Sequence, residues 1–179
     1  MKRISENKVG KEFQKNLLQM WASVTPYDEV MDYCKTTYNN VKKGRIPLTD
    51  IVKRGRVRQA LSSYKTVASG IAGVCYYNQH ISPDDPITDS FLFIECKSIK
   101  GPKWFMLPDG SKDRIAKFIS VKELKEFDER FIPDWNAYAF KSVVKKAKPI
   151  FEAMKWDIND FMLDENQRNL SDWLGSEEE

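Results

Sequence analysis

The sequence has little of the chemistry that most enzymes and metal sites use. It contains one histidine and three cysteines among 179 residues, and Cys34, Cys75 and Cys96 are far apart in the chain. This spacing excludes the clustered Cys and His ligands of a zinc site. An odd number of scattered cysteines favours reduced, buried thiols in a cytosolic protein. The single His80 precedes a predicted turn and is expected to be a surface residue.

Long apolar runs are also absent. Met1 is followed by charged residues, Lys2 and Arg3, so no signal peptide is recognised. No segment reaches the roughly 20 apolar residues that a membrane-spanning helix requires. We therefore expect a cytoplasmic protein, in the host cytoplasm if it is viral, with no membrane partner. Hydrophobic residues make up 41% and aromatic residues 12% of the chain, which is enough for a buried core.

Motifs for catalysis are missing as well. There is no phosphate-binding glycine loop, no Gly-x-Ser-x-Gly and no pairing of a nucleophile with a base. Nucleotidyl transfer needs two carboxylates that hold two divalent cations. The string Ile87-Thr88-Asp89-Ser90 offers only one carboxylate, so we expect no metal site there. We predict no catalytic residue, no metal ligand and no cofactor in this chain.

The sequence does contain a strong separation of charge. Residues 42–65 include eight Lys or Arg and one acid, Asp50. Residues 157–179 include eight acids and one base, Arg168. The basic stretch can neutralise nucleic-acid phosphates and release their counterions. The acidic end would be repelled from DNA and is expected to face solvent or a protein.

Apolar spacing predicts two helices in the first part of the chain. Ser5 can cap the first helix, in which one face carries Val9, Phe13, Leu17 and Trp21. The second starts near Asp28 and Glu29, which suit the positive end of a helix dipole, and ends at Gly44. A short strand at Ile51–Val52 and a short helix at Val57–Tyr64 should follow. The small residues from Ala68 to Gly73 indicate either tight helix packing or close approach of a phosphate.

The second half reads as a small sheet followed by helices. The β-rich runs Phe91–Ile94 and Trp104–Leu107 are expected to pair with each other, and Pro108–Gly110 is a turn signal. A short helix at Val121–Phe127 and a long helix at Trp135–Trp156 should follow, with Pro149 interrupting the latter. The predicted fold class is α+β, mainly helical with a small antiparallel sheet.

Several segments, in this order and spacing, resemble the thumb of family B DNA polymerases. They are Lys2-Arg3, Lys11–Leu18, Arg45–Val52, Arg58–Lys65, Gly73–Asn78, Asp134–Tyr138 and Pro149–Glu152. The segment Gly73–Asn78 is most similar to the versions from T-even-like bacteriophages. The resemblance implies a thumb domain at residues 1–163, in which residues 1–25 form the helix at the palm–thumb junction. A flexible acidic tail would occupy residues 164–179.

The resemblance also implies roles for particular residues. A thumb holds the primer–template duplex through its phosphates, independently of sequence. The residues that would contact the DNA backbone are Arg54, Arg56, Arg58, Tyr64 and Lys65. The residues that would dock on a palm domain are Phe13, Leu17 and Trp21. The structural alternative is that the basic side chains are simply solvated.

The acidic end carries a motif of its own. The segment from Gln167 to Leu174 fits Gln-x-x-Leu-x-x-aromatic-hydrophobic and is similar to the sliding-clamp-binding peptide of replicative polymerases. Leu170, Trp173 and Leu174 would share one side of a helical turn and enter an apolar pocket, with Gln167 hydrogen-bonding beside them. The alternative is an ordinary amphipathic turn that packs on the thumb itself.

These features favour one function over three others. The leading hypothesis is the small subunit of a split DNA-directed DNA polymerase. A larger chain would hold the exonuclease, palm and fingers together with the catalytic carboxylates and Mg²⁺, and this chain would add the grip on primer–template DNA and attachment to a sliding clamp. The sequence could instead be an excised domain of a longer polymerase. Two further classes fit parts of the pattern: a non-enzymatic DNA- or clamp-binding accessory protein and a metal-dependent nuclease.

Overall fold

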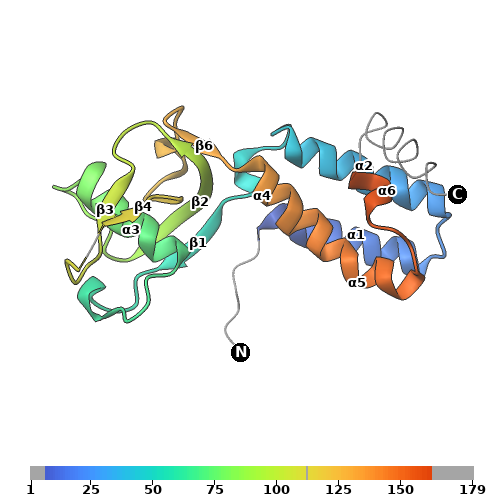
Figure 1. The fold of residues 1–179 in the computed structure, drawn as a ribbon, viewed down its shortest axis with the longest axis horizontal. Coiled ribbons are helices and arrows are strands. Elements are labelled where there is room, and N and C mark those ends of the chain that lie inside the picture. The colour runs from blue at the N-terminus through green and yellow to red at the C-terminus, as the bar shows by residue number, and fades with distance from the viewer. Residues whose placement is uncertain (1–6, 112, 163–179) are drawn as a thin grey trace, which may run out of the picture. The chain divides into compact units, whose positions relative to one another are not determined.

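The computed structural model describes residues 7–111 and 113–162 (Figure 1). They form two compact units, which we call the sheet unit and the helical unit. The sheet unit holds residues 47–137 with the few described residues before Val9, and the helical unit holds residues 9–46 and those from Tyr138 on. The predicted α+β class with a small antiparallel sheet is confirmed.

The first two helices of the helical unit form where the apolar spacing predicts them. They are α1 (Lys8–Ala22) and α2 (Tyr27–Lys42), and Gly44 follows α2 with a φ of 64°. The apolar face of α1 packs on α2, where the rings of Phe13 and Tyr33 stack with their centroids 5.5 Å apart. The predicted capping residue Ser5 lies outside the described residues.

The last long helix is interrupted, but not at Pro149. It consists of α4 (Trp135–Ala139), a π-helical turn (Phe140–Val144) and α5 (Lys145–Met154), and Pro149 lies inside α5. A proline removes the hydrogen bond to the carbonyl four residues earlier and crowds it. That carbonyl belongs to Lys145, the residue at which the π turn ends and α5 begins. The irregularity in the helix therefore lies one turn before the proline.

A cluster of aromatic rings packs between the helices of the helical unit. Lys155 ends α5 in the left-handed region with a φ of 57°, and the chain then turns into α6 (Asn159–Met162). Phe151 contacts Trp156 and Phe161 edge-on, with centroids 5.5 and 5.4 Å apart. Phe161 in turn meets Tyr38 of α2 at 6.0 Å. This cluster joins α2, α5 and α6 around one apolar centre.

The sheet unit is built around β2 (Ser90–Ile99). It pairs antiparallel with β1 (Lys53–Arg56), β5 (Phe118–Val121) and β6 (Phe131–Pro133). A separate two-stranded sheet joins β3 (Trp104–Met106) to β4 (Asp113–Ile115). The expected pairing of Phe91–Ile94 with Trp104–Leu107 is therefore wrong. The run Phe91–Ile94 instead lies between the basic strand β1 and the apolar strand β5. The run from Trp104 pairs with the exposed strand β4, and the sequence pattern revealed neither pairing.

Three short elements also differ from their predictions. The strand expected at Ile51–Val52 begins at Lys53, after a 3₁₀ turn at Leu48–Asp50. The helix expected at Val57–Tyr64 is reduced to a 3₁₀ turn at Leu61–Ser63, because side-chain hydrogen bonds replace the helical ones there. In place of a helix at Val121–Phe127, β5 ends at Val121 and a 3₁₀ turn follows at Leu124–Glu126.

Helix α3 (Ser69–His80) lies directly against the sheet (Figure 1). A Cβ atom on Gly73 would lie 2.6 Å from the backbone nitrogen of Ser120 and 2.9 Å from the carbonyl carbon of Ile119 in β5. The buried Ser120 hydroxyl donates a hydrogen bond of 2.7 Å to the carbonyl of Gly70. Of the two explanations for the small residues, tight helix packing is therefore the one that the structure bears out at Gly70 and Gly73.

Candidate nucleic-acid interface

Strand β1 presents two arginines on one face of the sheet. Arg54 and Arg56 alternate with Gly55, and both are exposed. Gly55 lies opposite Phe91 in the ladder, and a Cβ atom on it would be 3.2 Å from Cε1 of that ring and closer to two of its other atoms. The Phe91 ring therefore packs over the Cα of Gly55, in the space that a larger side chain would occupy. Since strand side chains alternate, Arg54 and Arg56 lie on the opposite face.

The loop after β1 places Arg58 and Lys65 in solvent. The backbone N–H of Arg58 donates to the hydroxyl of Tyr64 at 2.9 Å, and the Gln59 side chain donates to the carbonyl of Ser63 at 2.9 Å. The Tyr64 ring packs on the hydrophobic core of the sheet unit. Tyr64 therefore holds the loop in shape, while the cations of Arg58 and Lys65 have no ion-pair partner among the described residues.

Arg56 has a carboxylate partner that the sequence did not reveal. Its Nε donates to Asp89 Oδ1 at 2.8 Å, and its Nη2 is 3.4 Å from Oδ2 of the same carboxylate. The hydrogen bond to Asp89 raises the pKa of Arg56 above its ordinary value. Asp89 is the carboxylate of the string Ile87–Ser90, so that residue here serves as the counterion of a candidate DNA contact.

Replacing Asp89 with asparagine is expected to raise the affinity for duplex DNA. Exposed ion pairs are weak, so release of Arg56 should raise the affinity by at most roughly fivefold. Fluorescence anisotropy with a labelled duplex measures the change. Glu129→Gln removes the same charge from another exposed site and should have a smaller effect. An equal gain in DNA affinity in both variants would show that binding depends only on the net charge of the protein.

Lys122, the residue after β5, lies close to Arg54 in the folded chain. It lines a pocket of about 210 Å³ together with Arg54, Gly55, Ser90, Phe91 and Leu92. Its ammonium group forms an ion pair with Asp85. Sequence reasoning missed Lys122, because the pairing of β5 with β2 brings it beside a strand almost seventy residues earlier. The pocket therefore has two cationic side chains on its rim, one of them already neutralised.

The predicted docking residues on α1 differ in exposure. Phe13 and Leu17 are only 1% and 0% exposed, whereas Trp21 is 50% exposed. The indole N–H of Trp21 lies 3.1 Å from the sulfur of Met154 in the same unit. Phe13 and Leu17 are thus already covered within the chain, so neither offers a free surface for docking on a palm domain. Of the three predicted docking residues, Trp21 is the one whose exposure fits a docking role.

The cysteines and His80 have the burial that the sequence predicts. All three cysteines are buried and free, as expected. Burial raises the pKa of Cys34 and Cys96 to about 12 and that of Cys75 to about 11, so they are protonated thiols rather than thiolates at neutral pH. His80 is exposed, as predicted, and its Nε2 lies 2.8 Å from the carbonyl oxygen of Trp104.

The described residues contain neither a cluster of metal ligands nor a membrane-spanning helix. No group of three or more metal-ligating side chains occurs among residues 7–111 and 113–162. No helix in this part of the chain is long and apolar enough to cross a membrane. The clamp-binding motif, with Gln167, Leu170, Trp173 and Leu174, lies outside the described residues, as does the predicted boundary at residue 163.

The fold is similar to part of a polymerase. The family B DNA polymerase from the hyperthermophilic archaeon Pyrobaculum calidifontis matches 80% of this chain with a TM-score of 0.56 and 14% sequence identity. The match covers 17% of the polymerase chain. No protein-family model and no curated protein matches the sequence. The likeness shows a polymerase-related fold.

Proposed function

We propose that the chain grips primer–template DNA as the thumb of a family B DNA polymerase. The observation that carries this proposal is the run of exposed cations Arg54, Arg58 and Lys65 on a strand edge and loop of a polymerase-related fold. No ion-pair partner neutralises them within the described residues. Lysine and arginine in such positions bind phosphates and release condensed counterions.

The local structure favours phosphate contacts over base readout. Sequence-specific proteins generally place a helix or a two-stranded ribbon in the major groove. The cations proposed here lie in residues 53–65, which we call the basic segment. This segment is instead one edge strand, β1, followed by a loop with a single 3₁₀ turn at Leu61–Ser63. Side chains on such a surface reach the backbone of a duplex, so binding would be independent of sequence.

The proposal includes three partners. Primer–template DNA would bind the sheet unit, and a larger polymerase chain would supply the catalytic carboxylates and Mg²⁺. Exposed Trp21 would contribute to docking on the palm of that chain. The motif from Gln167 to Leu174 would attach the assembly to a sliding clamp. A primer-extension assay in which the larger chain gained neither activity nor processivity would exclude this role.

Removing Arg54 and Arg58 tests the duplex interface. The double substitution Arg54→Gln/Arg58→Gln is expected to weaken binding to a primer–template duplex by roughly tenfold or more, because two phosphate contacts are lost. The plot of log affinity against log salt concentration should flatten by about 2 units, since each contact contributes about 0.9. Anisotropy titrations between about 50 and 200 mM salt measure both values.

A matched control removes two charges elsewhere. Lys11→Gln/Lys15→Gln changes the net charge equally on α1, outside the basic segment, and should leave the salt slope nearly unchanged. If the arginine variant kept the wild-type slope, these side chains would not lie on phosphates. If duplex binding depended on them but primer extension did not respond to the chain, the protein would be a DNA-binding accessory factor.

A further inference from the structure

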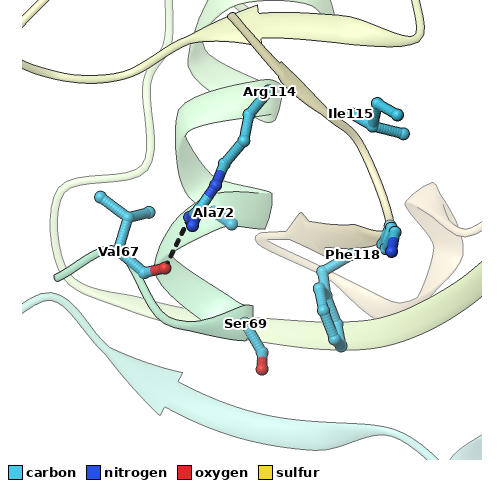
Figure 2. A pocket seen from close by; sticks show the side chains of 7 residues that line it. Val67, Ser69, Ala72, Arg114, Ile115 and Phe118 are labelled. Carbon is cyan, nitrogen blue, oxygen red and sulfur yellow. Dashed lines mark hydrogen bonds between the residues drawn. The ribbon is translucent and has the colours of Figure 1, made fainter. Parts of the chain in front are cut away.

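A second pocket of the sheet unit lies between the start of α3 and the segment from β4 to β5 (Figure 2). Its volume is about 420 Å³. It is lined by Val67, Ser69, Ala72, Arg114, Ile115, Lys117 and Phe118. Figure 2 shows Arg114 reaching toward the carbonyl of Val67, with Ile115 and Phe118 across the pocket from Val67. Neither β1 nor the loop of residues 57–65 lines this pocket.

The charged side chains that line the pocket are all positive. Arg114 and Lys117 both line it, and no carboxylate is among the described residues that do so. Arg114 donates one hydrogen bond of 2.8 Å, from Nη1 to the carbonyl of Val67. That bond fixes the guanidinium, and its other N–H groups find no acceptor in the described part of the chain. Lys117 is exposed and likewise has no described ion-pair partner.

The rest of the lining is apolar. The apolar part of the lining comes from four side chains, those of Val67, Ala72, Ile115 and Phe118. The Ser69 hydroxyl adds one polar group. A bare anion such as inorganic phosphate would use the cations and leave this apolar surface empty. A deoxyribose–phosphate unit uses both, because its phosphate pairs with cations and its sugar presents C–H groups. The volume is also within the range of sites that hold a ligand of that size.

We propose that this pocket binds one sugar–phosphate unit of the nucleic-acid backbone, as a second contact beside the basic segment. The inference rests on the proposed function. Val67 follows Lys65 by two residues, so the chain passes directly from the candidate interface into the pocket. Arg114 and Lys117 hold the phosphate, and Ile115 and Phe118 contact the sugar. A duplex bound to the basic segment would thereby meet a further pair of cations.

Replacing Lys117 with glutamine tests the proposal. The substitution removes one phosphate contact, so the salt slope of duplex binding should flatten by about 0.9. Lys100→Gln is the matched control, since Lys100 is exposed, carries the same charge and does not line the pocket. Its slope should equal that of the wild type. Lys117 is exposed and makes no described ion pair, so both variants are expected to fold normally.

A second measurement identifies the ligand. Backbone amide resonances of Ser69, Ala72 and Phe118 should shift when a short duplex is added, and less in Lys117→Gln. Shifts with inorganic phosphate and none with the duplex would overturn the proposal in favour of a small-anion site. If the salt slope of duplex binding were unchanged in Lys117→Gln but reduced in Arg54→Gln/Arg58→Gln, the pocket proposal would be overturned and the proposed function would still hold. If the slope were reduced only in Lys117→Gln, the pocket would be supported and the arginine interface rejected.

Discussion

Replacing Gly73 with alanine is expected to lower the free energy of unfolding by roughly 1–3 kcal/mol, and valine by more. A Cβ atom there would lie 2.6 Å from the nitrogen of Ser120 and 2.9 Å from the carbonyl carbon of Ile119. Both are backbone atoms of β5, which cannot rotate away. Relief of the overlap requires α3 or β5 to shift, at the expense of the packing around them.

The sign of this effect is informative, because helix propensity acts in the opposite direction. Alanine is about 1 kcal/mol more favourable than glycine inside a helix, so Gly73→Ala at an open site would stabilise α3. Urea unfolding followed by circular dichroism measures the difference. Ser69→Ala, at the exposed start of α3, should change stability by less than about 0.5 kcal/mol. A stabilised Gly73→Ala would mean that α3 does not approach β5 so closely.

Helices α1 and α2 could be predicted because their own sequences dictate them. Val9, Phe13 and Leu17 repeat every four residues, so α1 buries one face wherever it packs. Strands β1 and β4 offer no such signal. The first reads Lys-Arg-Gly-Arg and the second Asp-Arg-Ile, and all three residues of β4 are exposed. Both are strands because a partner supplies the hydrogen bonds, β2 for the first and β3 for the second.

The candidate site, like the fold, could be predicted only where its residues are close together in the sequence. Charge density along the chain showed that residues 42–65 are basic, and the resemblance to a polymerase thumb implied Arg54, Arg58 and Lys65 as the candidate contacts within them. The pairing of Arg56 with Asp89 was not, since the two are 33 residues apart and meet only through the β1–β2 ladder. The pocket of Arg114 and Lys117 was missed for the same reason. Neither residue belongs to a basic run, and the fold places them beside α3.

Substituting both Leu170 and Trp173 with alanine is expected to abolish clamp attachment. In the proposed peptide these two side chains enter one apolar pocket, and buried anchors of this kind contribute at least about 2 kcal/mol each. Loss of both should therefore weaken binding by roughly a thousandfold. Surface plasmon resonance on immobilised sliding clamp measures this, and synthesis on short templates should be unaffected because it does not need the clamp.

The neighbouring positions provide the control for this experiment. Asn169→Ala/Ser171→Ala alters the same segment but leaves all four motif positions intact, so it should retain nearly wild-type affinity. Such peptides fold on binding, and both variants place two alanines in the segment that folds. A loss in both would indicate that the whole segment, and not its apolar anchors, makes the contact. Unchanged clamp affinity in Leu170→Ala/Trp173→Ala would refute the assignment, and the acidic end would then need another partner.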